Sequence, residues 1–499
     1  MRYALTSERM RAAEAAADTT LSGLMERAGA ALAAEVQRAH PSGSVTIVCG
    51  AGNNGGDGWV AARALAEAGR AVQVLALREP DGLAGEAREA AAAASGSVAW
   101  QHVSDARTLE RAVEGSSVVI DAIFGIGLHG AVREPYRSLI GAIATCGVPV
   151  VSADIPSGLD ADTGMAAGPV VRAAMTVTFS ALKPGLLMEP GRSLSGRVVV
   201  VDIGVPVDGV GALEVPGRCD LRGLMRWPAP EDHKGSRGTV AVVAGSAAYP
   251  GAAALAAAGA LRMGAGYVHV VTPAPAAGVV RQAWPNAIVR LVAADDDGAI
   301  ASAVEVLEAV SGADAVVVGP GLTTGTGPAA AVRALIAEAA TPLLLDADAL
   351  NVLTGEVDAL RRRNAPTVIT PHPGEAGRLL GSDVSAVSHD RLKAASALSG
   401  DRLVCLLKGP GTLVVGGGRS AIVGSGGPGL ARAGTGDVLA GMIGTALAQG
   451  VDTFDAAVLG AYLHGRAGER GAEDLTDTCL TAVDLPGYIH LAVRELSGG

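Results

Sequence analysis

Short apolar runs alternate with alanine-rich amphipathic stretches along most of the chain. In the first half, the runs 44–49, 117–122, 149–153 and 198–203 each predict a buried strand. Leucine, methionine and alanine recur at helical spacing within 7–40, which predicts one or two packing helices without chemistry of their own. Strands that alternate with helices are typical of parallel sheets, so the pattern predicts an α/β fold.

The second half repeats this alternation with different sequences and no internal duplication. Predicted strands cover 239–244, 266–272, 314–322, 342–350, 367–375 and 402–412. The two halves therefore share a class of architecture, and each is expected to carry its own motifs.

A change in composition separates the two series. The chain has 499 residues, which is too long for one ordinary core, so two or three domains are expected. A proline- and glycine-rich stretch begins after Gly204 and marks a boundary. We therefore predict a first domain over 1–215, a linker over 216–232 and a second domain over 233–496.

Charge and cysteine usage narrow the classes of partner. The formal net charge of −11 argues against nucleic acid or an anionic membrane as a partner. The first ten residues include charges and no apolar segment, so we expect no signal peptide. The longest uncharged window, 238–261, is broken by glycine and proline and does not predict a membrane span. Five scattered cysteines form no CxxC pair, which fits free thiols in a reducing cytoplasm.

Polar clusters follow three of the predicted strands in the first half. They are GAGNNGGDG at 50–58, Asp121 with FGIGLHG at 124–130, and DIPSGLD at 154–160. Ligands of parallel sheets bind where the strands end, so the three clusters are expected to converge. Each cluster alone also fits a plain turn or a helix cap. We predicted the helix after the first cluster over 59–68.

The oxygen-bearing side chains of these clusters suggest a cation site. Asn54, Asp121 and Ser157 offer only oxygen ligands, which suit a hard cation rather than zinc or copper. No zinc-ligand spacing and no GxxxxGK[ST] phosphate loop occurs in the sequence.

The stretch AGTGDVLAG, 433–441, is the strongest chemical motif of the second half. Its glycines leave the backbone bare where an apolar helix, predicted over 438–447, begins. The amides and dipole of a helix N-terminus attract phosphate oxygens. Asp437 stands in the first turn, where it could accept a proton from a hydroxyl group beside that phosphate. The alternative is a capped helix after a glycine turn, because aspartate favours that position.

Lysine is rare in this chain and marks further motifs. Only Lys183, Lys234, Lys393 and Lys408 occur, and all but Lys393 stand in glycine-containing motifs. Lys408, in LKGPGT, could place a compact positive charge near a phosphate. His372, in TPHPGE, could hydrogen-bond a substrate or merely cap the helix that follows.

The first half resembles the N-terminal domain of bacterial NAD(P)H-hydrate repair enzymes, through NNGGDG, D…FGIGLHG, DIPSGLD and TFSALKPGLL. The resemblance implies a Rossmann-like three-layer epimerase domain, with potassium held by Asn54, Asp121 and Ser157. It implies that the hydrated dinucleotide, NAD(P)HX, is bound by Asn53, Asn54, Gly55, Gly56, Asp57, Gly125, Ile126, Gly127, Leu128, His129, Gly130, Ala131 and Asp154. Asp154 is our candidate for proton transfer during inversion at C6.

The second half resembles ribokinase-like proteins, and more narrowly the NAD(P)HX dehydratase domain. VVVGPGL, TPHPGE, LKGPGT and AGTGDVLAG occur in that family's order. The resemblance implies a nucleotide site at Lys408, Gly409, Pro410, Gly411, Thr412 and Gly436, and a hydrate site at Ala252, Gly321, His372 and Asp437. One departure is Thr323, where family members commonly have glycine.

Together the motifs predict a bifunctional enzyme that epimerises the R and S forms of NADHX and NADPHX and dehydrates the 6S form. ADP would donate a phosphoryl group to the C6 hydroxyl, with magnesium, giving AMP and phosphate, and Asp437 would be the base. We expect small-molecule partners only, no nucleic acid or membrane, and a homo-oligomer in the cytoplasm. The alternative is a kinase of a small alcohol or vitamin precursor with a non-catalytic N-terminal binding module.

Overall fold

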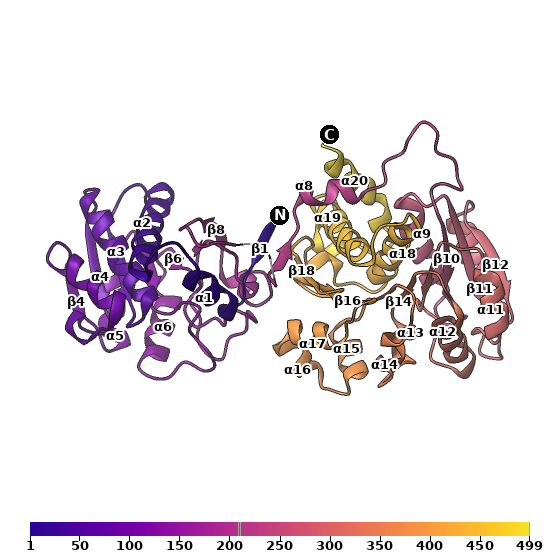
Figure 1. Cartoon of the computed structure of the whole chain (residues 1–499), viewed down its shortest axis with the longest axis horizontal. Helices are drawn as coiled ribbons and strands as arrows, with labels where there is room; N and C mark the ends of the chain where they lie inside the picture. Colours follow the sequence, from indigo (N-terminus) through magenta and orange to yellow (C-terminus); the bar gives the residue numbers. More distant parts are fainter. Residues whose placement is uncertain (208, 210, 499) are drawn as a thin grey trace. The chain divides into compact units, whose positions relative to one another are not determined.

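The computed structural model describes residues 1–207, 209 and 211–498. Its contacts divide the chain into two compact units, Arg2–Leu213 and the chain from Glu214 onward (Figure 1). Separation by packing does not test independent folding, so the domain limits given above stay a prediction. Leu221, within the predicted linker, is buried in the core of the second unit. No helix of the described residues combines the length and apolarity needed to cross a bilayer.

The N-terminal unit is built on a seven-stranded parallel sheet of order β4-β3-β2-β5-β6-β7-β8. The strands are β1 (Arg2–Ala4), which lies outside this sheet, β2 (Val45–Cys49), β3 (Val72–Ala76), β4 (Ala99–His102), β5 (Val118–Ala122), β6 (Val150–Ala153), β7 (Met175–Phe179) and β8 (Arg197–Val201). The helices are α1 (Ser7–Ala15), α2 (Leu21–Ala39), α3 (Asn53–Glu67), α4 (Gly85–Ser95), α5 (Ala106–Val113), α6 (Tyr136–Ala144) and α7 (Gly191–Leu194).

Helices cover both faces of this sheet, as the predicted three-layer arrangement requires. Alternate strand side chains point to opposite faces. Ile47 packs in the core formed with α2, α3 and α4, whereas Val48 packs in the core formed with α5 and α6. The crossover changes direction between β2 and β5, so a crevice opens at the carboxyl ends of these strands. The α/β fold class is confirmed.

One predicted boundary of this unit is wrong. The glycine-rich segment does not form a loop ahead of the helix, because α3 begins at Asn53 rather than at residue 59. A Cβ on Gly55 would stand 2.0 Å from the carbonyl oxygen of Gly50. A Cβ on Gly58 would stand 2.7 Å from the Cβ of Ala122. The glycines therefore allow the first turns of α3 to approach the sheet closely.

The C-terminal unit contains a larger mixed sheet of order β9-β18-β17-β16-β15-β14-β13-β10-β11-β12. The strands are β9 (Leu213–Val215), β10 (Thr239–Val243), β11 (Tyr267–Pro273), β12 (Ile288–Val292), β13 (Ala315–Val318), β14 (Leu343–Leu345), β15 (Thr367–Ile369), β16 (Leu403–Leu407), β17 (Thr412–Gly416) and β18 (Arg419–Val423). From β10 to β16 neighbouring strands are parallel, and β16, β17 and β18 form an antiparallel meander.

Helices α9, α18, α19 and α20 pack on the same core as one face of this sheet. The helices of the unit are α8 (Arg218–Leu221), α9 (Pro250–Arg262), α10 (Ala274–Ala283), α11 (Ala303–Val310), α12 (Thr326–Glu338), α13 (Asp348–Asn351), α14 (Val357–Arg361), α15 (Pro373–Leu380), α16 (Val384–His389), α17 (Arg391–Ala397), α18 (Thr435–Ala448), α19 (Thr453–Cys479) and α20 (Ile489–Ser497). Figure 1 shows α12 to α17 beneath the sheet and α18 and α19 above it.

Several predicted strands of this unit were too long. The strand predicted over 314–322 ends at Val318, and the one over 342–350 ends at Leu345, before Asp348 opens α13. The run 367–375 is a strand to Ile369 and a helix from Pro373. The run 402–412 is strand β16, a turn, and the first residue of β17. Three of these runs continue into a motif whose glycine or proline ends the strand, whereas in the run 342–350 the strand is followed by Asp346 and Ala347, just before α13.

Candidate active sites

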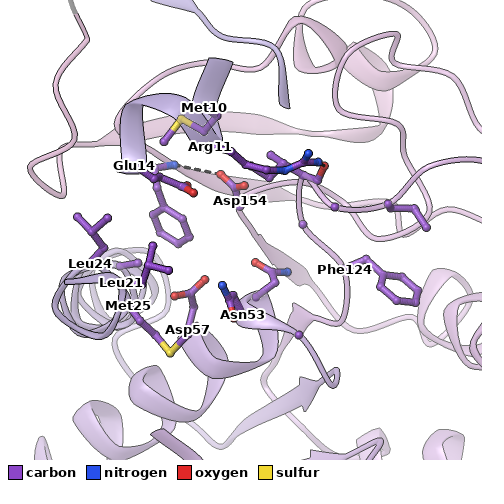
Figure 2. Close-up of a pocket in the computed structure, with 18 of the residues that line it drawn as sticks. Met10, Arg11, Glu14, Leu21, Leu24, Met25, Asn53, Asp57, Phe124 and Asp154 are labelled. Carbon is purple, nitrogen blue, oxygen red and sulfur yellow. Dashed lines mark hydrogen bonds between the residues drawn. The ribbon is translucent and has the colours of Figure 1, made fainter. Parts of the chain in front are cut away.

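A cavity of about 460 Å³ opens at the carboxyl ends of β2, β5 and β6 in the N-terminal unit. Helices α1 and α2, the first turn of α3, and the segments after β5, β6 and β7 form its walls (Figure 2). Predicted residues that line it are Asn53, Asn54, Asp57, Gly125, Ile126, Gly127, Leu128 and Asp154. Gly55, Gly56, His129, Gly130 and Ala131 are not among the lining residues; Gly55 packs on Gly50 and Gly56 on Met25.

A buried ion pair between Lys183 and Asp154 lies on one wall of this cavity. The ammonium group of Lys183 donates a short hydrogen bond to Oδ1 of Asp154, and Lys183 is completely buried. It also donates to Oγ1 of Thr178 at 3.0 Å and to the carbonyl of Phe179 at 3.1 Å. Asp154 adopts a φ of 61°, a left-handed conformation that is costly for a non-glycine residue. The surroundings therefore hold this carboxylate in one orientation.

Two further carboxyl groups face the same cavity with raised pKa values. Burial, with the charges of Asp154 and Glu14, raises the pKa of Asp57 well above its ordinary value. Burial and the charge of Asp154 also raise the pKa of Glu14, although Lys183 and Arg11 oppose this. Glu14 and Arg11 come from α1 and Lys183 from the segment after β7. We did not predict Glu14, Arg11 or Lys183 as cavity residues, although the rarity of lysine and the motif TFSALKPGLL both pointed to Lys183.

Two residues of the predicted cation site, Asp121 and Ser157, are hydrogen-bonded to each other, and the third, Asn54, lines the cavity. Asp121, completely buried, accepts hydrogen bonds from the amide and hydroxyl of Ser157 at 2.8 and 2.6 Å. Burial raises the pKa of Asp121, although the bonds from Ser157 and Ser152 lower it. The hydroxyl of Ser157 accepts the amide of Phe124 at 2.9 Å. Both polar atoms of the Asn54 side chain are buried and have no hydrogen-bond partner among the described residues.

This orphaned amide is the feature that a bound ion would explain. A Cβ on Gly125, next to Phe124, would stand 3.4 Å from Oδ1 of Asn54, so that oxygen lies close to the segment that Ser157 contacts. An unpaired buried amide is costly, and a carboxylate surrounded by donors carries an uncompensated charge. Oxygen donors of this kind suit potassium, so the residues present fit the ion.

The motifs predicted in the C-terminal unit lie at the carboxyl ends of β14, β15 and β16. α18 begins at Thr435 rather than at residue 438, with Gly434 as its N-cap in the left-handed conformation (φ 91°). Asp437 stands in the first turn, as the sequence predicted. The buried imidazole of His464 contacts the carbonyl of Thr435 at 2.8 Å, and burial lowers its pKa to about 4. The neutral imidazole of His464 therefore holds the backbone at the start of α18 through this contact.

Lys408 lies at the centre of an acidic cluster. Its ammonium group donates to Oδ1 of Asp346 at 2.7 Å and lies 3.7 Å from Oε2 of Glu375. A Cβ on Gly436 would stand 3.5 Å from Nζ of Lys408, so the lysine reaches the start of α18. Burial would lower the pKa of Lys408, but Asp346 and Glu375 together hold it above its ordinary value.

This environment changes the chemistry of Asp437. Burial, together with the charge of Asp346, raises the pKa of Asp437 to about 7, while Lys408 opposes the rise. A carboxyl group with that pKa exchanges a proton easily near neutral pH, which is the property of an efficient general base or acid. No role was predicted for Asp346, which lies in the strand predicted over 342–350, or for Glu375, which closes the motif TPHPGE.

The other predicted residues of this half lie around the same edge. Gly321 packs on Ala252, where a Cβ would stand 2.8 Å from that residue's Cβ. His372 is the N-cap of α15, and its Nδ1 accepts the amide of Gly374 at 2.9 Å. His372 therefore caps the helix, while its side chain stays half-exposed, with Nε2 3.5 Å from Oε1 of Glu375. Gly409, Pro410 and Gly411 form the turn between β16 and β17, which ends at Thr412.

Arg391 stabilises this turn through hydrogen bonds to its backbone carbonyl groups. Its guanidinium donates to the carbonyl of Pro410 at 2.6 Å and to that of Leu407 at 3.3 Å. Arg391 is buried, which lowers its pKa to about 10. The sequence analysis did not identify this arginine, because it lies 17 positions before Lys408 and carries no motif.

The backbone explains the family difference at Thr323. This residue has a φ of 67°, a conformation that glycine adopts freely and a β-branched residue adopts at a cost. The amide of Thr323 donates to Oδ2 of Asp348 at 2.9 Å, which holds the turn in place.

Each half of the chain matches a known protein family. The family model "NAD(P)H-hydrate dehydratase" matches residues 240–489, and the model "YjeF-related protein N-terminus" matches residues 21–185. The chain is 36% identical over 490 residues to the bifunctional NAD(P)H-hydrate repair enzyme Nnr of Moorella thermoacetica, covering 95% of this chain and 92% of the relative. It is 39% identical over 503 residues to the enzyme of the same name from Salinibacter ruber, with the same coverage.

A solved structure is similar to the second half. It is the ADP/ATP-dependent NAD(P)H-hydrate dehydratase from Bacillus subtilis, co-crystallised with ATP and Mg²⁺, at 28% identity and a TM-score of 0.49. The match covers 57% of this chain and 99% of that chain. Because relatives above 30% identity are matched over nearly their whole length, and both halves match family models in order, the chain belongs to the family of bifunctional NAD(P)H-hydrate repair enzymes.

Proposed function

We propose that this chain epimerises the R and S forms of NADHX and NADPHX and dehydrates the 6S form to NADH or NADPH. The observation that carries the proposal is Asp437, a carboxyl group with a pKa of about 7 in the first turn of a bare helix N-terminus. It stands beside Lys408, which can face a phosphate. Base, cation and anion cradle at one place are what phosphoryl transfer to a hydroxyl group needs.

In the dehydratase site, hydroxide at C6 is a poor leaving group, and a phosphoryl group makes it a better one. Asp437 removes the proton of the C6 hydroxyl while that oxygen attacks the terminal phosphate of ADP. The amides at the start of α18 and the ammonium of Lys408 stabilise the charge that develops. Phosphate then leaves C6 and a proton leaves C5 to solvent, which forms the C5=C6 bond and restores the dihydronicotinamide, and AMP is the second product. The turn at 408–412 holds the nucleotide, and Gly321, Ala252 and His372 hold the hydrate.

Magnesium belongs to this half of the proposal. Mg²⁺ binds mainly through substrate phosphates, water and one or two carboxylates, and it neutralises phosphate charge. Asp346 and Glu375 are the carboxylates beside Lys408 that would complete its ligands.

In the epimerase site, Asp154 is the group that transfers a proton, and Lys183 holds it in place. The cavity at Asn53, Asn54, Asp57 and 125–131 receives the hydrated nicotinamide. Potassium would be held by Asn54, Asp121 and Ser157, where its charge would offset the buried carboxylate of Asp121. The orphaned amide of Asn54 supports this assignment.

We also propose that ADP rather than ATP is the donor and that the protein is a homo-oligomer in the cytoplasm. Initial rates with each nucleotide test the first point. Light scattering of the purified protein tests the second, and a single-chain mass would contradict it. Localisation of a fluorescent fusion tests the compartment.

One experiment tests both activities together. The full-length protein is mixed with both hydrate epimers, ADP, Mg²⁺ and K⁺, and the absorbance of dihydronicotinamide is followed. We expect complete conversion, because the epimerase supplies the 6S form as the dehydratase consumes it. Conversion that stops when the 6S form is spent would mean that the first half does not epimerise. Steady formation of a phosphorylated alcohol without NADH would instead identify a kinase.

A further inference from the structure

The cavity of the N-terminal unit contains a carboxyl group that the mechanism above does not use. Asp57 reaches the cavity from α3, whereas Asp154 enters from the segment after β6. In Figure 2, Asp154 stands above the open space and Asp57 below it, with Glu14 at the side. Among the described residues, the carboxyl group of Asp57 takes part in no hydrogen bond or ion pair. It is therefore free to bind a substrate.

The two carboxyl groups differ in their surroundings. Asp154 is paired with the ammonium of Lys183, which donates a hydrogen bond to its Oδ1. Asp57 faces Glu14 and Asp154 across the cavity, and none of the described residues forms an ion pair with it. Burial and these like charges raise the pKa of Asp57, so it keeps a proton at a pH where an exposed aspartate has lost it. When the surroundings of two carboxyl groups differ in this way, one can act as the acid and the other as the base.

Inversion at C6 needs a group that donates a proton and a group that accepts one in the same site. C6 of the hydrate carries a hydroxyl group and is bonded to the ring nitrogen N1, so it is a hemiaminal carbon. Its configuration is lost when the C6–O bond breaks and water adds to the other face. One group must give a proton to the departing oxygen, and another must take a proton from the incoming water.

We propose that Asp57 is a second catalytic residue of the epimerase site, which protonates the C6 hydroxyl while Asp154 deprotonates the water that adds to the opposite face. This inference rests on the proposed epimerase function. The proton of Asp57 passes to the hydroxyl oxygen, and the C6–O electron pair leaves with water as the N1 lone pair forms an N1=C6 bond. Water then adds to C6, that π pair returns to N1, and the extra proton passes to Asp154. Solvent returns both carboxyl groups to their starting states, and no oxidant or reductant is consumed.

The test compares Asp57→Asn with the wild-type protein and with Glu67→Gln, an exposed carboxylate at the far end of the same helix. One purified epimer is supplied without ADP, and its conversion to the other epimer is followed by chromatography. We expect the Asp57→Asn rate to fall by about 10² to 10⁴, the usual contribution of a general acid. Glu67→Gln should retain the wild-type rate, and Asp57→Glu should recover part of it.

The melting temperature reports whether the Asp57→Asn protein is folded, and dehydration of the 6S form with ADP, whose site lies in the other unit, should match the wild type. If the melting temperature or dehydration shows misfolding, Asp57→Glu decides the question through its pH profile. Its rate should decline at a different alkaline pH from the wild type, because the proton donor has changed. If the rate of Asp57→Glu declined at the same alkaline pH as the wild-type rate, Asp57 would not be the proton donor.

Isotope transfer tests the bond that breaks. Epimerisation in H₂¹⁸O should place ¹⁸O on C6 of the inverted product, which mass spectrometry detects. If the wild type does not epimerise, the proposed function itself fails. If the wild type epimerises but Asp57→Asn does so equally fast, only the role of Asp57 fails. Retention of ¹⁶O in the inverted product would overturn cleavage of the C6–O bond and this role with it.

Discussion

Replacement of Asp437 by asparagine should inactivate the dehydratase and, above neutral pH, stabilise the fold. Asparagine has the same shape but neither accepts a proton nor carries a charge. Loss of a general base costs about 10² to 10⁴ in rate. We therefore expect kcat for dehydration of the 6S hydrate to fall by at least a hundredfold while ADP binding changes little, because Lys408 and the turn at 408–412 remain.

The gain in stability follows from the pKa of Asp437. Its rise from the ordinary 3.8 to about 7 means that ionisation of this carboxyl group is less favourable in the folded than in the unfolded state by roughly 4 kcal/mol. The wild-type protein keeps this stability in full below the unfolded pKa near 4 and loses it as the pH rises to about 7. Asparagine never ionises, so the variant should be more stable above pH 7 by up to about 4 kcal/mol and equally stable near pH 4.

Thermal melts at pH 4 and pH 9 measure this difference, and about 4 kcal/mol corresponds to a rise of up to roughly 10 °C for the C-terminal unit. Asp358→Asn is the matched control, because Asp358 is highly exposed and should change neither property. The wild-type kcat/KM should rise with an apparent pKa of about 7. Turnover of Asp437→Asn within tenfold of wild type, or a melting temperature no higher at pH 9, would refute the reasoning.

Three other outcomes follow from buried or strained groups. Lys183→Met leaves Asp154 without its partner, so epimerisation should fall and the N-terminal unit should lose about 3–5 kcal/mol in thermal melts, whereas the exposed Lys393→Met should change neither. Thr323→Gly relieves a left-handed residue and should raise the unfolding free energy by up to about 1 kcal/mol; a decrease would contradict the strain. Potassium should raise the melting temperature of the wild type more than choline does, and Asn54→Ala should abolish that difference.

Much of the site was predictable from the sequence because it is built of local motifs. Asp437 follows the glycines that leave a helix N-terminus bare, so its place in the first turn could be inferred from five consecutive residues. Asp121 and Ser157 could be joined because parallel strands end at one edge of a sheet. The boundaries were less certain, since α3 begins at Asn53 within a segment whose glycines suggested a loop. Those glycines serve close packing on β2 and β5, which is a tertiary requirement.

The sequence by itself determined the α/β class through its periodicity, and the family and the motif residues through the resemblance of short motifs, because both are encoded within a few neighbouring positions. Only the tertiary structure decided which ionisable groups interact. Lys183 meets Asp154 across 29 residues, and Lys408 meets Asp346 across 62. The pKa of Asp437 depends on burial and on charges that other strands deliver, and no local pattern carries that information. Desolvation and Coulomb interactions act through space, so they are set only when the chain has folded.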